Sequence, residues 1–195
     1  MRLALLVLVL LLATTMNAIA VPVLHFTAPP NSYKSAVNPP EDYTFNGVAA
    51  SVQFSHAPSD RDLADRFWAE TTSEPYAFRS LLESGAVLVN GSDAPIEELD
   101  PLLGIRAGVA RTLDGREAWR AEQAVTVEQA LHASTVAPAW LAGDERRRGK
   151  LVPGYLADLV VLDRDPLACE PEELGEVQVV ATMLGGAWTH NRPPW

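Results

Sequence analysis

The chain has 195 residues, of which 48% are hydrophobic, and a formal net charge of −10. This length suffices for one ordinary domain with a sizeable core, and the composition excludes wholesale disorder. The acidic balance argues against nucleic acid or an anionic membrane as a partner, and a single cysteine excludes an internal disulfide and a cysteine-based zinc cluster.

The N-terminus has the three parts of a secretory signal peptide. Met1-Arg2 supplies a positive start, an apolar run extends from Leu3 to Ala13, and Ala18-Ile19-Ala20 forms a small-x-small end. The run is shorter than the roughly 20 residues that span a bilayer, so a leader over residues 1–20 is favoured over an uncleaved membrane anchor or a misassigned start. A genuine leader predicts a secreted or periplasmic protein, and otherwise the chain is cytoplasmic. Residues 21–43 then predict a linker, because their prolines remove backbone donors and block helix propagation.

The rest of the chain alternates between strand and helix patterns. Between Phe45 and Ser134 the order is strand, two helices, strand, two helices, and the second strand carries an apolar run typical of a strand covered on both faces. The predicted elements are a strand over 48–54, helices over 60–71 and 76–84, a strand over 86–89, and helices over 101–111 and from the capping box at 126–129. Such alternation indicates an α/β fold with parallel βα units over residues 44–148. Residues 149–195 predict a small β region.

The residues that could carry chemistry follow the two strands. Asp93 comes directly after the second strand and a Gly-Ser step, where a carboxylate could serve as metal ligand or general base. Gly91 would allow a sharp turn there. The alternative is a purely structural role, in which Asp93 only caps the following helix. His56 lies just beyond the first strand. None of the four histidines stands at a chelating spacing to another, so the residues alone do not define a complete active site.

Five segments together resemble one family. The segment from Gly47 to Asp60 resembles the seventh-strand region of the amidohydrolase 3 family, a branch of the metal-dependent hydrolases that includes N-substituted formamide deformylases. The segments 76–85, 89–95 and 126–131 are similar to the helix before the last barrel strand, the end of that strand, and the helix that follows. The segment 149–163 resembles the return into a β-sandwich. The resemblance covers about residues 44–190.

This resemblance implies a fold, a reaction and roles for two residues. The fold would be the C-terminal remnant of a (β/α)8 TIM-type barrel over residues 44–148, with a β-sandwich portion over 149–195. The reaction would be hydrolysis of a non-peptide, amide-type C–N bond in a small molecule by water that a divalent metal, zinc by preference, activates. Asp93 would bind the metal and exchange protons with the attacking water and the leaving nitrogen, and His56 would lie on the substrate side. Phe54 departs from the family, which usually has proline there.

The family's remaining metal ligands have no counterpart in this sequence. They come from earlier strands of the barrel, and only two of eight barrel strands are recognisable here. We therefore expect a hydrolase lineage whose truncated chain holds metal weakly and is inactive alone. The alternative is a non-catalytic module that binds a partner or completes a barrel with an N-terminal fragment supplied by another chain.

Overall fold

The computed structural model describes residues 7–8, 48–70 and 74–191. The expected linker over 21–43 lies outside these residues. So does the expected leader, except for β1 (Val7–Leu8), which forms a two-residue strand. Within the described part of the chain, no helix has both the length and the apolar character to cross a bilayer.

Two parallel strands form the first sheet. β2 (Ala49–Val52) pairs with β3 (Val87–Asn90) in the register Ala49 to Val87 through Val52 to Asn90. Their parallel pairing requires a crossover, which the intervening helices provide. The expectation of parallel βα units is confirmed for this pair.

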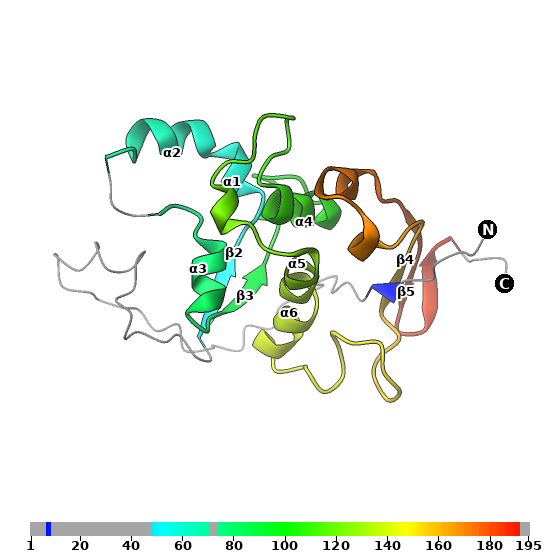
Figure 1. Ribbon diagram of the computed structural model, residues 1–195. Helices are drawn as coiled ribbons and strands as arrows, with labels where there is room; N and C mark the ends of the chain where they lie inside the picture. The colour runs from blue at the N-terminus through cyan, green and yellow to red at the C-terminus, as the bar shows by residue number, and fades with distance from the viewer. Residues whose placement is uncertain (1–6, 9–47, 71–73, 192–195) are drawn as a thin grey trace.

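Helices surround this pair and link it to the second sheet. α5 and α6 contact β3, α3 contacts it as well, and α4 packs on α5. In Figure 1, α4, α5 and α6 lie between the β2–β3 pair and the sheet that contains β4 and β5. The helices are α1 (His56–Ser59), α2 (Arg61–Phe67), α3 (Phe78–Glu83), α4 (Pro101–Ala110), α5 (Val127–Ser134) and α6 (Val136–Leu141), with short 3-10 helices η1 (Ala121–Gln123), η2 (Pro166–Ala168) and η3 (Pro171–Glu176).

The second sheet is antiparallel and has the strand order β1-β4-β5-β6. Its strands are β1, β4 (Leu159–Leu162), β5 (Val179–Leu184) and β6 (Ala187–His190). Asp158 is buried, and its carboxylate accepts a hydrogen bond from the backbone N–H of Gly185 at 2.7 Å, which ties the β5–β6 turn to the start of β4. The described residues thus contain the expected C-terminal β region as one sheet.

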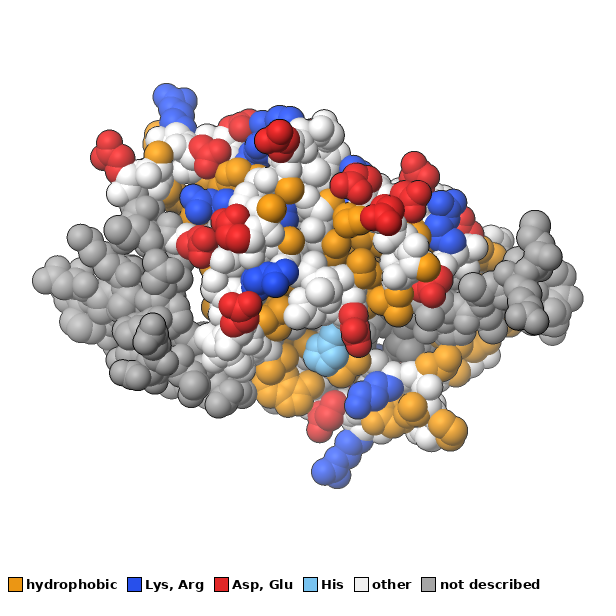
Figure 2. Space-filling model, viewed as in Figure 1, with side chains coloured by type: hydrophobic (Ala, Val, Ile, Leu, Met, Phe, Trp, Pro, Cys, Tyr) orange, Lys and Arg blue, Asp and Glu red, His pale blue; other side chains and the backbone are white. Residues whose placement is uncertain are grey.

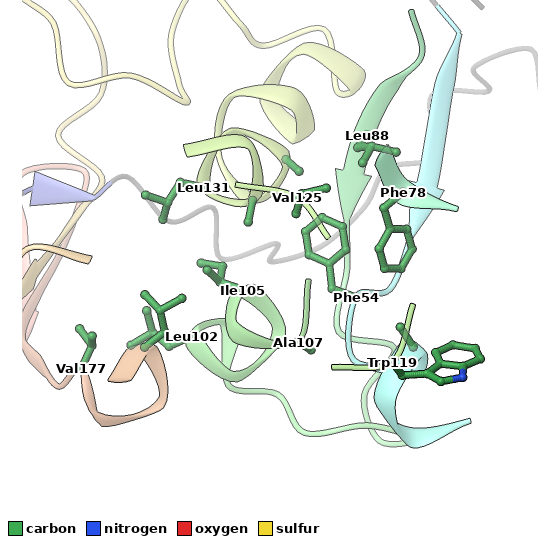
Figure 3. Packing of buried hydrophobic residues seen from close by; sticks show 14 of the residues in the cluster. Phe54, Phe78, Leu88, Leu102, Ile105, Ala107, Trp119, Val125, Leu131 and Val177 are labelled. Atoms are coloured by element: carbon green, nitrogen blue, oxygen red, sulfur yellow. The ribbon is translucent and has the colours of Figure 1, made fainter. Parts of the chain in front are cut away.

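One apolar core joins the two parts of the molecule. Phe54, Ile105 and Leu174 are fully buried within it, although they come from the β2–α1 turn, α4 and η3. Figure 3 shows Phe54 and Phe78 close together beside β3, and their ring centroids are 4.9 Å apart in an edge-to-face arrangement. Phe54, the departure from the family pattern, is therefore a central core residue.

Two predicted elements end earlier than expected. The first strand ends at Val52, and His56 begins α1 instead of following the strand directly. The helix predicted over 60–71 is α2, which ends at Phe67. Its apolar side chains Leu63 and Phe67 are 57% and 64% exposed. Helical spacing predicts which side chains share a face, but only tertiary packing decides whether that face is covered.

Candidate functional site

The carboxyl ends of β2 and β3 lie at the same edge because the two strands are parallel and in register. The chain after β2 enters α1 with His56 as its first residue, and the chain after β3 reaches Asp93 three residues past Asn90. The topology thus brings together two side chains that are 37 positions apart in the sequence. These are the two site residues that the sequence predicts.

The side chains of His56 and Asp93 approach each other closely at this edge. His56 Nε2 lies 3.3 Å from Asp93 Oδ2, and the side chains are 21% and 48% exposed. His56 Nε2 itself is buried, and it makes no hydrogen bond of good geometry to a described residue.

The backbone conformation at Asp93 presents its carboxylate at this edge. Asp93 has φ +60°, a left-handed conformation that is uncommon for residues other than glycine, asparagine and aspartate. Gly91 has no positive φ, and a Cβ there would meet nothing within 4 Å, so neither the backbone conformation nor the space around it requires glycine at this position. The helix-cap alternative for Asp93 is wrong, because Asp100 caps α4 by accepting from the N–H of Leu102 at 2.9 Å.

Asn90 is a residue of this site that the sequence analysis missed. Its Oδ1 accepts a hydrogen bond from the backbone N–H of Phe54 at 3.0 Å, and its Nδ2 donates to Ser134 Oγ at 3.3 Å. The side chain thus connects the end of β3 with the β2–α1 turn and with α5. An amide at the end of an otherwise apolar strand run was the available signal.

Two further contacts hold the loops around the pair. Ser59 Oγ donates to Glu97 Oε1 at 2.6 Å, which ties α1 to the loop after Asp93. The Tyr76 hydroxyl donates to Asp60 Oδ2. Burial first, and then the hydrogen bond and the charge of Asp60, raise the pKa of Tyr76 well above its ordinary value.

A buried arginine lies against Tyr76, Phe78 and Trp119. Arg111 is fully buried and follows α4 in a left-handed conformation, and its Nε and Nη1 donate to the carbonyls of Trp119 and Tyr76 at 3.0 and 3.3 Å. Its guanidinium carbon lies 5.0 Å from the centroid of the Phe78 ring. Burial lowers the pKa of Arg111 to about 10, which still leaves the group cationic at neutral pH.

The described residues do not fit a complete metal centre. Catalytic zinc sites use about three protein ligands, and His56 with Asp93 offers two. Among residues 7–8, 48–70 and 74–191, no group of three or more His, Cys, Asp and Glu side chains is placed to hold a metal ion. The other two described histidines, His132 and His190, are exposed on α5 and β6.

Comparisons with known proteins extend this picture. YtcJ of Bacillus subtilis (strain 168), which is named as an amidohydrolase, is 33% identical over 143 residues. The match covers 71% of this chain and 27% of YtcJ. The N-substituted formamide deformylase of Arthrobacter pascens is 33% identical over 117 residues, covering 60% of this chain and 22% of the deformylase. This chain thus spans about a quarter of the length of these relatives.

Solved structures agree with the fold. A metal-dependent hydrolase from Pyrococcus horikoshii matches with a TM-score of 0.53 and 33% identity over 62% of this chain and 25% of its own. An adenosine deaminase from Xanthomonas campestris with bound zinc matches with a TM-score of 0.52 at 22% identity, over 74% of this chain and 32% of its own. The amidohydrolase family profile matches residues 43–190, which include both strand ends and most of the antiparallel sheet. The chain belongs to the amidohydrolase family.

Proposed function

We propose that this chain carries the last two strand ends of a metal-dependent amidohydrolase site and does not hydrolyse a substrate by itself. The observation that carries the proposal is the 3.3 Å approach of His56 Nε2 and Asp93 Oδ2 at the carboxyl ends of adjacent parallel strands. Active sites of parallel barrels are built at this face. The set of possible metal ligands supports the inactivity. Among the described residues this edge offers Asp93 and, even if His56 is counted, two ligands, whereas a catalytic zinc site uses about three.

The two side chains have different roles in the proposed reaction. Asp93 is half-exposed and held by a left-handed backbone, so its carboxylate can take a proton from an attacking water and return it to the leaving nitrogen. His56 faces the same point from α1 and lies on the substrate side. The reaction class is hydrolysis of a non-peptide C–N bond in a small amide, which the name of the deformylase relative supports.

A second candidate is a non-catalytic module that completes a barrel with another chain. β2 favours it, because strands of parallel sheets are normally covered on both faces, whereas Ser51 is exposed and the rest of β2 is only half-buried. β2 also pairs with one described strand, β3. A six-strand N-terminal fragment of a related amidohydrolase would cover this strand and bring its own metal ligands.

One experiment separates the two candidates. The purified full chain is assayed with zinc and an N-substituted formamide, alone and after mixing with a fragment of the Arthrobacter pascens deformylase that lacks the matched region. We expect no hydrolysis and no stoichiometric zinc with the chain alone. Hydrolysis by the mixture would establish the barrel-completing role, and its absence would contradict that role.

The matched control is Asp93→Asn, which keeps the shape of the side chain and removes its charge. Hydrolysis by the chain alone that disappears in this variant would contradict the proposed inactivity. Hydrolysis by the mixture that survives in the variant would contradict the role given to Asp93.

Export through a leader at residues 1–20 belongs to the same proposal. Removal of these residues would also remove β1, which pairs with β4 through Val7 to Val161 and Leu8 to Val160. The mass of the chain recovered from the medium or periplasm of an expressing bacterium tests the proposal. A chain that keeps Met1 and stays in the cytoplasm would contradict it.

A further inference from the structure

The ladder between β2 and β3 is continued by a side chain where the backbones separate. The last backbone hydrogen bond of the pair runs from Gly91 N–H to the carbonyl of Val52 at 2.9 Å. Two residues further along, beyond the end of the described ladder, the N–H of Phe54 donates to Asn90 Oδ1 at 3.0 Å. The amide of Asn90 therefore takes the place of a strand partner for Phe54.

This contact fixes the point at which α1 starts. The carbonyl of Phe54 accepts a hydrogen bond from the N–H of Ala57 at 3.2 Å. The peptide groups on both sides of Phe54 are therefore hydrogen-bonded. The Phe54 ring is fully buried, which restricts rotation of the turn about this residue. The hydrogen bonds of the Phe54 peptides and the burial of its ring therefore fix the position of His56, which follows two residues later.

Asn90 itself is held from the other end. Its Nδ2 donates to Ser134 Oγ of α5 at 3.3 Å, so the amide uses one acceptor and one donor on two different elements. Asn90 also lies three residues before Asp93 on the chain. A single side chain thereby connects the strand that leads to Asp93 with the turn that leads to His56.

We infer that Asn90 is a positioning residue that sets the approach of His56 Nε2 to Asp93 Oδ2. The inference rests on the proposed function in one respect, namely that these two groups work as a pair. Loss of the Asn90 amide removes the partner of the Phe54 N–H, and the β2–α1 turn then moves away from the loop after β3. The apolar core and the β2–β3 ladder do not depend on this amide.

The test measures the geometry of the pair directly in the full chain. In the wild type, a nuclear Overhauser effect is expected between the His56 ring protons and the Asp93 β-protons. Asn90→Ala should lose this effect, and the Phe54 amide should exchange with solvent roughly 5- to 10-fold faster, as expected for one lost hydrogen bond. Amides in the middle of α4 serve as the internal reference, and their exchange rates should stay unchanged.

Two variants distinguish positioning from a general structural role. Asn90→Asp keeps an oxygen for the Phe54 N–H and should retain the effect between His56 and Asp93. Ser134→Ala removes the partner of Nδ2 while leaving the Oδ1 contact, and should retain it as well. If Asn90→Ala does not fold, Asn90→Leu replaces it, since that side chain has the same branched shape and number of heavy atoms and lacks both polar groups.

The outcomes decide the inference independently of any catalytic assay. Loss of the effect in Asn90→Ala or Asn90→Leu, with retention in Asn90→Asp, supports it. Retention in the alanine or leucine variant would overturn it, as would equal loss in all the variants. Failure of the formamide assay would instead count against the proposed function and would leave this geometric result intact.

Discussion

At the scale of single residues, the fold depends on one close approach between a glycine and an aromatic ring. A Cβ at Gly108 of α4 would lie 2.8 and 2.9 Å from ring carbons of Phe54, which is fully buried. A Cβ at Gly104, one turn earlier on the same helix, would meet Asn90 and Ser55 atoms at ordinary distances of 3.6 and 3.7 Å. These two glycines therefore differ in what an added methyl group would contact.

We predict that Gly108→Ala destabilises the protein by about 1–3 kcal/mol, because the buried Phe54 ring must shift to admit the methyl group. Gly104→Ala is the matched control. It should be neutral or stabilising by up to about 1 kcal/mol, since alanine is the better helix former. Urea unfolding followed by circular dichroism measures both. Equal stability of the two variants would show that the Phe54 contact is not restrictive.

Tyr76 gives a prediction about pH. Burial and Asp60 raise its pKa above the ordinary value of 10.0, so the folded state holds the neutral phenol more firmly than the unfolded state does. This contribution to stability is complete below pH 10 and is lost as the pH rises through the folded-state pKa. Phenolate absorbance of the wild type and Tyr76→Phe should therefore match at pH 10.5 in the folded state, and the wild type should exceed the variant in urea. If the folded wild type already had more phenolate absorbance than Tyr76→Phe at pH 10.5, the raised pKa of Tyr76 would be contradicted.

At the scale of elements, the start of α5 was predicted well from the sequence. Thr126 accepts from the N–H of Gln129 at 3.1 Å, and Gln129 Oε1 accepts from the N–H of Thr126 at 2.8 Å. This capping box was expected from the residue types alone, because both partners lie within one turn. The left-handed conformations at Asp93 and Arg111 were not expected from the residue types.

Removal of the cap should affect the whole α5 helix. We expect Thr126→Ala to destabilise the protein by about 1 kcal/mol, because the N–H of Gln129 loses its partner. Thr126→Ser keeps the hydroxyl and should stay close to the wild type. The midpoints of urea unfolding compare the three proteins. A serine variant as unstable as the alanine variant would show that the methyl group, and not the cap, matters.

At the scale of the whole molecule, apolar side chains are unevenly covered. On the face shown in Figure 2, orange apolar patches lie between acidic and basic side chains. On α2, Leu63 is 57% exposed and lines a shallow pocket with Ala64 and Phe67, whereas Leu102 of α4 is only 5% exposed. The two leucines offer the same chemical change in opposite environments.

We predict that Leu63→Ala changes the free energy of unfolding by less than about 0.5 kcal/mol, because little apolar area is lost. Leu102→Ala should cost about 2–5 kcal/mol, through lost burial and the cavity left behind. Light scattering should also show less self-association for Leu63→Ala, since exposed apolar patches promote it. A large loss of stability in Leu63→Ala would mean that α2 is covered in solution.

Features that depend on residues close together in the sequence were predictable, whereas features that depend on long-range contacts were not. The alternation of strands and helices, the parallel βα unit, the capping box and the position of Asp93 after the second strand follow from local patterns and were predictable. The 3.3 Å approach of His56 and Asp93, the role of Asn90 and the burial of Phe54 against Gly108 were decided by tertiary structure. Each of these joins residues more than 30 positions apart, and no local propensity encodes which of them will meet.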